Sequence, residues 1–130
     1  VSPGPRNYIV GIGYNGFPRG CSDEMLPWSK DAEDPLENKY MYVCHAEVNA
    51  ILNASGGANL SGCRMYVAKF PCHECAKVII QSGICEIIYD CDKKHDEVSY
   101  VASRRMLDLA NVKYVAFDQR KLAIDFESHK

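Results

Sequence analysis

The sequence lacks an excess of charge of either sign, because its 15 lysines and arginines nearly balance its 17 aspartates and glutamates. Proteins that hold nucleic acid by its phosphates usually show a strong basic excess, so a nucleic-acid partner is disfavoured. No apolar run approaches the roughly 20 residues that a membrane span needs, and the start of the sequence shows no signal-peptide pattern. We therefore expect a cytoplasmic protein with neither nucleic acid nor membrane as a partner.

A disulfide framework is not indicated either. The seven cysteines are an odd number, and they are scattered through 130 residues of which 47% are hydrophobic. A chain of this size and composition can build an ordinary core without covalent cross-links. We expect one domain over 1–130, with reduced thiols and a metal site in place of disulfides.

Turn residues divide the sequence into alternating strands and helices. Asn15-Gly16 closes a first strand, Pro71 stands in the first turn of a helix, and Gly83 ends that helix. The expected strands cover 7–14, 63–69, 84–90 and 112–117, and the expected helices cover 44–55, 71–83 and 98–109. Between 17 and 38 the pattern indicates a long irregular loop. Strands that alternate with helices predict an α/β fold with parallel neighbouring strands.

Two cysteines and a histidine form a candidate metal site. Cys72 and Cys75 stand three residues apart at an expected helix start, where both sulfurs face one side of the first turn and the helix dipole favours thiolates. His45 opens another expected helix and is the obvious third ligand. A zinc site with three protein ligands is of the catalytic type, with water in the fourth position. The cysteines alone leave a redox CxxC pair as the alternative.

A glutamate beside the histidine completes a known signature. The motifs HAE (45–47) and PCHEC (71–75) together form the H-x-E…P-C-x-x-C pattern of zinc nucleobase deaminases. Loss of an amine from a pyrimidine needs hydroxide at neutral pH, and zinc lowers the pKa of bound water from about 16 to about 7. Glu47 would carry the protons. Because positions i and i+2 diverge around a regular helix, His45 must lie at its very first turn.

Over most of its length the sequence resembles the deoxycytidylate (dCMP) deaminases. The resemblance rests on the segments GIGYNGFPRGCSD (11–23), LPW (26–28), DPLENKYMYVCHAEVNAILN (34–53), MYVAKFPCHECAKVIIQSG (65–83) and DKKHD (92–96). The zinc signature is common to the wider cytidine deaminase superfamily, whereas GYNG and the HAExNA form of the first motif are typical of this family. The resemblance implies a three-layer α/β/α fold with a mixed sheet of about five strands.

The resemblance also implies an activity and its regulation. Zinc would be bound by His45, Cys72 and Cys75, Glu47 would be the proton shuttle, and dCMP and water would give dUMP and ammonia for thymidylate synthesis. The family is activated by dCTP with Mg²⁺, is inhibited by dTTP, and commonly assembles as hexamers, so we expect a homo-oligomer. Its regulatory region includes the GYNG loop, which here consists of Gly13, Tyr14, Asn15 and Gly16.

Substrate contacts are expected from Asn15, Ala46 and Tyr89. In related deaminases an Asn at the end of the second strand contacts the sugar, so Asn15 serves either the active site or the regulatory site. Tyr89 lies near the C-terminal end of its strand, where α/β sheets bind ligands. Candidate phosphate donors are Arg19, Lys93, Lys94 and His95, and the same rule favours those of the 91–95 segment.

Two departures from the family and three rival functions stand beside this interpretation. The family's first helix and first strand are expected to be absent, and His73 inside PCHEC is expected to face solvent. A deaminase of dCTP, cytidine or an RNA base would keep every zinc residue. A non-catalytic subunit of the same fold would be expected to lose Glu47 or a ligand, and a thiol–disulfide oxidoreductase would need neither Glu47 nor His45.

Overall fold

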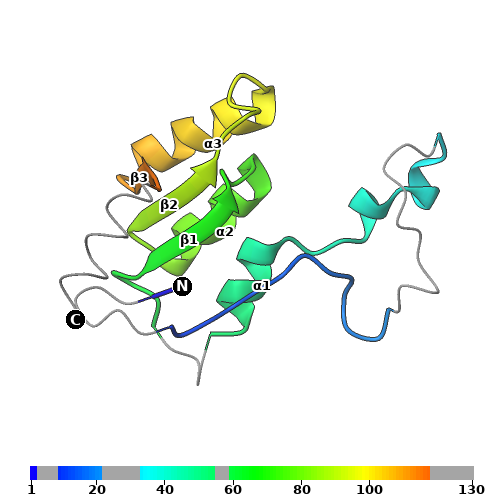
Figure 1. Ribbon diagram of the computed structural model, residues 1–130, viewed down its shortest axis with the longest axis horizontal. Helices are drawn as coiled ribbons and strands as arrows, with labels where there is room; N and C mark the ends of the chain where they lie inside the picture. The colour runs from blue at the N-terminus through cyan, green and yellow to red at the C-terminus, as the bar shows by residue number, and fades with distance from the viewer. Residues whose placement is uncertain (3–8, 22–32, 55–58, 118–130) are drawn as a thin grey trace.

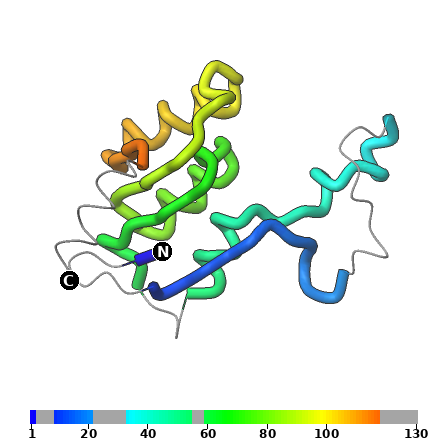
Figure 2. The backbone as a smooth tube through the Cα atoms, in the orientation of Figure 1, coloured from blue at the N-terminus to red at the C-terminus, as the bar shows by residue number. Residues whose placement is uncertain are grey.

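The computed structural model describes residues 1–2, 9–21, 33–54 and 59–117, and these form a small α/β structure (Figure 1). The strands are β1 (Arg64–Lys69), β2 (Glu86–Cys91) and β3 (Lys113–Ala116), and the α-helices are α1 (Ala46–Leu52), α2 (His73–Ser82) and α3 (Val98–Leu109). Two short 3₁₀ helices, η1 (Pro35–Glu37) and η2 (Lys39–Met41), precede α1. They lie on an arm that extends away from the sheet, as the backbone tube in Figure 2 shows.

The three strands form a parallel sheet in the order β1-β2-β3, with Met65 opposite Ile87 and Ile87 opposite Tyr114. Both crossovers run in the same direction across the sheet, so the right-handed rule places α2 and α3 on one face. The contacts agree, because α2 packs against both α1 and α3. Because the strands are parallel, their carboxyl ends lie at the same edge of the sheet, next to the first turn of α3 (Figure 1).

The core lies between this helical layer and the inner face of the sheet. Met65, Ile79, Ile87 and Leu107 are at most 1% exposed, and each contributes about 1.5–3 kcal/mol through burial. On the opposite face of the sheet Tyr66 is 52% exposed. Among the described residues no helix is both long enough and apolar enough to cross a membrane.

The α/β class and the parallel strand neighbours are confirmed. The described residues give three parallel strands with helices on one face, which is part of the family's sheet of about five strands, from which the first strand was expected to be missing. The helices and strands after residue 60 lie within two residues of their expected bounds. The helix expected over 44–55 is shorter in the structure, since α1 ends at Leu52.

The expected strand over 7–14 was wrong for its described part, because residues 9–15 join no strand ladder. Its glycines explain why. A Cβ atom at Gly13 would lie 2.2 Å from the backbone nitrogen of Ala50, and one at Gly11 would lie 2.4 Å from the carbonyl oxygen of Ala50. The segment therefore lies directly on the backbone of α1, and its contacts with other segments include the isolated bridge from Gly16 to Cys44.

Candidate functional site

The histidine and the first cysteine of the two motifs occupy equivalent positions, because each is the residue immediately before a helix. His45 is the N-cap of α1 and Cys72 is the N-cap of α2, both with extended backbone angles and neither with a side-chain capping bond. His45 was expected in the first turn of its helix, and it stands one position before that turn. Pro71 precedes the N-cap, so its expected place inside the first turn was wrong by two positions.

The fold brings the three candidate ligands together. One donor atom from each of His45, Cys72 and Cys75 lies within 4.8 Å of the others. The Nδ1 atom of His45 is 3.2 Å from the Cys75 sulfur and 3.6 Å from the Cys72 sulfur. In a tetrahedral zinc site with ordinary bond lengths, a nitrogen and a sulfur ligand stand about 3.5 Å apart. The donor set therefore fits one zinc ion bound through Nδ1.

A hydrogen bond between the two cysteines leaves one of them as a thiolate, which favours the binding of a cation. A hydrogen bond from Cys75 lowers the pKa of Cys72 to about 5, and the nearby His45 adds to the effect against the opposing influence of burial. The same bond raises the pKa of Cys75, as do its burial and the Glu47 carboxylate. One sulfur is therefore a thiolate at neutral pH, and thiolates are the form that binds metal.

Glu47 is the second residue of α1, and its carboxylate stands close enough to Cys75 to interact with its thiol. It is not one of the three clustered donors. A carboxylate beside a metal site that does not itself bind the metal is suited to accept and return protons.

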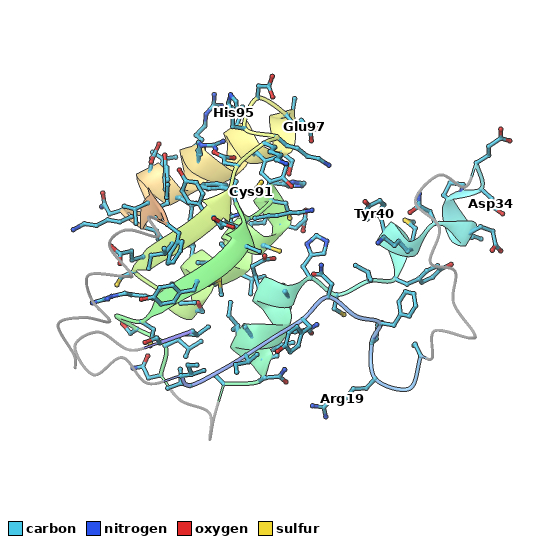
Figure 3. All side chains as sticks on the ribbon, viewed as in Figure 1. Arg19, Asp34, Tyr40, Cys91, His95 and Glu97 are labelled. Atoms are coloured by element: carbon cyan, nitrogen blue, oxygen red, sulfur yellow. The ribbon has the colours of Figure 1, made fainter. Side chains whose placement is uncertain are left out.

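These residues open into a cavity of about 430 Å³, within the range of small-molecule sites. His45, Glu47, Cys72 and Tyr100 line its metal end. Its other lining residues include Asn15, Tyr40, Lys69, Phe70, Cys91, Asp92, Lys93 and Lys94. The cavity therefore lies at the carboxyl ends of β1 and β2, where Figure 3 shows Cys91 below the turn that bears His95 and Glu97.

The glycine-rich segment joins the site through α1. The side-chain oxygen of Asn15 accepts the backbone N–H of Ala46 at 2.8 Å, and the side chain of Asn49 donates to the carbonyl oxygen of Tyr14 at 2.7 Å. Asn15 and Ala46 also line a second cavity of about 940 Å³ between this segment, α1 and β1. Asn15 thus lies where it can reach the active site, whereas Tyr14 is 79% exposed.

Other expected residues lie elsewhere. Tyr89 packs edge-on against Phe70, with 5.0 Å between the ring centroids, and it does not line the cavity. Arg19 lies away from the strand ends (Figure 3). His95 directs Nδ1 at the carbonyl oxygen of Asp92, 3.3 Å away.

The structure also changes the interpretation of His73. Its side chain is 42% exposed, but its Nδ1 atom lies 2.7 Å from the hydroxyl oxygen of Ser99, and its backbone N–H donates to the same oxygen at 3.2 Å. The ring is thus held against α3 instead of facing solvent freely.

Lys69, Phe70, Asp92 and Tyr100 line the cavity but were not among the expected site residues. Lys69 ends a parallel strand, so the rule that ligands bind at the carboxyl ends of strands could have identified it. Tyr100 follows from no local pattern, because it reaches the site from α3 only through the packing of that helix.

Comparisons with known proteins agree with this geometry. Residues 4–91 match the family model described as the cytidine and deoxycytidylate deaminase zinc-binding region. The chain is 55% identical to the deoxycytidylate deaminase of Mus musculus and 53% identical to that of Homo sapiens, each over 125 residues that cover 95% of this chain and 70% of the relative.

A solved structure supports the fold. The dCMP deaminase from the cyanophage S-TIM5, in complex with dCMP and dUMP, superposes with a TM-score of 0.58 at 23% identity. The superposition covers 86% of this chain and 75% of the phage chain.

Proposed function

Because the chain belongs to the cytidine and deoxycytidylate deaminase family, we propose that it catalyses the zinc-dependent hydrolysis of dCMP to dUMP and ammonia. The observation that carries the proposal is the cluster of His45, Cys72 and Cys75 at the end of a cavity that Glu47 also lines. A single cavity thus combines a fitting metal site with a proton carrier. The names of the curated relatives favour dCMP among cytosine compounds.

The roles of the residues follow from where they stand. When bound, zinc supplies the Lewis acidity that makes water nucleophilic at neutral pH. Glu47 accepts a proton from the attacking water, passes it to the ring nitrogen next to the reacting carbon, and delivers the second proton to the departing amine. Asn15 holds the start of α1 through Ala46 and presents its side chain to the same cavity.

The cavity also suits the charged part of a nucleotide. Lys69, Lys93 and Lys94 line it, and they come from the end of β1 and the turn after β2. Ammonium groups are effective phosphate donors. We therefore place the base at the zinc ligands and the phosphate near the lysines.

Several further expectations belong to the same proposal. They are activation by dCTP with Mg²⁺, inhibition by dTTP through the 13–16 loop, assembly as a homo-oligomer, a cytoplasmic location, and a single deaminase domain over 1–130. The position of Asn15 between the two cavities is compatible with either of its expected roles.

The proposal is tested by the loss of ultraviolet absorbance on dCMP, dCTP, cytidine and cytosine, with zinc-loaded protein and its Glu47→Gln variant. We expect dCMP to react fastest, and we expect the variant to lose at least about 100-fold in kcat with unchanged zinc content. Faster turnover of another cytosine compound would overturn the assignment of the substrate. An active Glu47→Gln variant would overturn the mechanism.

A further inference from the structure

Arg104 on α3 makes several contacts near the cavity, and the proposed reaction does not use it. Its guanidinium pairs with the Asp92 carboxylate and donates to the carbonyl oxygens of His95 and Tyr100, at 3.1 and 3.3 Å. Its Cζ atom also lies 4.3 Å from the ring centroid of Phe70, a cation–π contact. Arg104 thus fastens α3 to the turn and to the aromatic ring that form one wall of the cavity.

Arg104 is the single partner that the described part of the chain gives the Asp92 carboxylate. Its Oδ2 atom accepts from Arg104, while its Oδ1 atom is buried and has no hydrogen-bond partner among the described residues. Yet Asp92 lines the cavity beside Lys93 and Lys94. A carboxylate at this position, without a neutralising partner, would oppose any anion that these lysines attract.

The other charged residues of the cavity are arranged differently. Lys69 also lines it, and the described residues place no carboxylate within ion-pair distance of Lys69, Lys93 or Lys94. Glu47 is the other acid in the lining, and it stands at the metal end. Asp96 and Glu97 are exposed on the turn and do not line the cavity. Whether the three lysines can attract an anion therefore depends on whether the negative charge of Asp92 is neutralised by an ion pair.

We propose that Arg104 is a positioning residue for the phosphate of the nucleotide substrate: by pairing with Asp92, it cancels the carboxylate that, among the described residues, would repel a phosphate beside the lysines of the cavity. The inference rests on the proposed function for the presence of a phosphate beside these lysines. It adds a residue that contacts neither the phosphate nor the zinc ligands. Its effect is exerted through charge, so it should depend on Asp92.

The test is a charge cycle measured on zinc-loaded protein with dCMP and with deoxycytidine, which lacks the phosphate. The variants are Arg104→Gln, Asp92→Asn and the double variant, with Arg105→Gln as the matched control. Arg105 is the exposed neighbour of Arg104 on the same helix. Each variant is measured for KM, kcat, zinc content and dCMP affinity by calorimetry.

We expect Arg104→Gln to raise the KM for dCMP by at least about tenfold with kcat changed less than about threefold, and to leave the KM for deoxycytidine nearly unchanged. The double variant should recover most of the lost dCMP affinity, because the repelling carboxylate is gone. Asp92→Asn alone should lower the KM for dCMP. A structural role alone would affect both substrates and would not be relieved by the second substitution.

Other outcomes separate this inference from the proposed function. If dCMP is deaminated but the double variant is no better than Arg104→Gln, or if Asp92→Asn raises the KM for dCMP, the role of Arg104 is overturned and the function stands. If Arg104→Gln does not fold, the Asp92→Asn result decides. If dCMP is bound but not deaminated, calorimetry still tests the charge cycle. Binding of neither compound overturns both.

Discussion

Asn15 accepts the backbone N–H of Ala46 through its side-chain oxygen, and so it caps a helix that begins 31 positions later in the chain. The residue at the N-cap position itself, His45, makes no capping bond with its own side chain. The cap of α1 is therefore supplied from the glycine-rich segment. This arrangement couples that segment to the helix on which Glu47 stands.

Substitutions of Asn15 should show how much its capping bond contributes to stability. Asn15→Ala removes the acceptor and is expected to lower the free energy of unfolding by about 1 kcal/mol, the usual effect of losing a cap. Asn15→Asp keeps the acceptor and places a negative charge at the positive end of a helix, so it should retain stability. Chemical denaturation of the three proteins measures this. Equal loss in both variants would show that the capping bond does not matter.

Gly13 should tolerate no side chain, whereas Gly16 should. A Cβ atom at Gly13 would lie 2.2 Å from the backbone nitrogen of Ala50 and 2.3 Å from the carbonyl oxygen of Ala46, and both atoms belong to α1. Gly13→Ala is expected to cost about 2–3 kcal/mol of stability and to shift the helix that carries Glu47. Gly16→Ala meets nothing within 4 Å and should stay within about 0.5 kcal/mol of the parent. Similar melting temperatures for the two variants would contradict the close packing.

The two serines of α3 give a matched pair with opposite expectations. Ser99 accepts the backbone N–H of His73, so Ser99→Ala should cost about 1 kcal/mol. The Ser103 hydroxyl is buried without a hydrogen-bond partner among the described residues, so Ser103→Ala should be neutral or stabilising. Thermal unfolding measures both. A larger loss for Ser103→Ala than for Ser99→Ala would be the opposite of what these contacts predict.

Metal removal should expose a reactive thiolate. With its pKa lowered to about 5 by the hydrogen bond from Cys75, Cys72 stays a thiolate at every pH above that value. In metal-free protein its rate of alkylation should change little between pH 8 and pH 6, while that of an ordinary thiol falls roughly 75-fold. Mass spectrometry after iodoacetamide treatment measures the rate. Adding zinc should suppress the reaction, and alkylation that is indifferent to zinc would argue against Cys72 as a ligand.

The sequence predicted the elements whose signals are local. Gly83 ends α2 with a positive φ angle of 87°, and the helix over 98–109 was placed correctly by its apolar spacing. The zinc cluster was accessible for the same reason, since its residues belong to two short motifs.

What the sequence could not supply are relationships set by distant packing. Residues 9–15 carry apolar and β-favouring side chains typical of a strand, yet their glycines let them lie on α1. Tyr89 satisfied the strand-end rule but is turned toward Phe70. The pairing of Arg104 with Asp92 joins a helix to a turn, and neither residue type signals the other in the sequence.

The N-cap positions of His45 and Cys72 have a consequence for local motion. Neither His45 nor Cys72 caps its own helix, because both side chains are directed at the same cluster. Asn15 and Ser99 accept the first amide groups of α1 and α2 instead. A zinc ion bound by these residues would link the first turn of α1 to the first turn of α2. The two first turns would then open together and not independently. Hydrogen exchange at the first-turn amides of both helices should therefore slow in parallel as zinc is added.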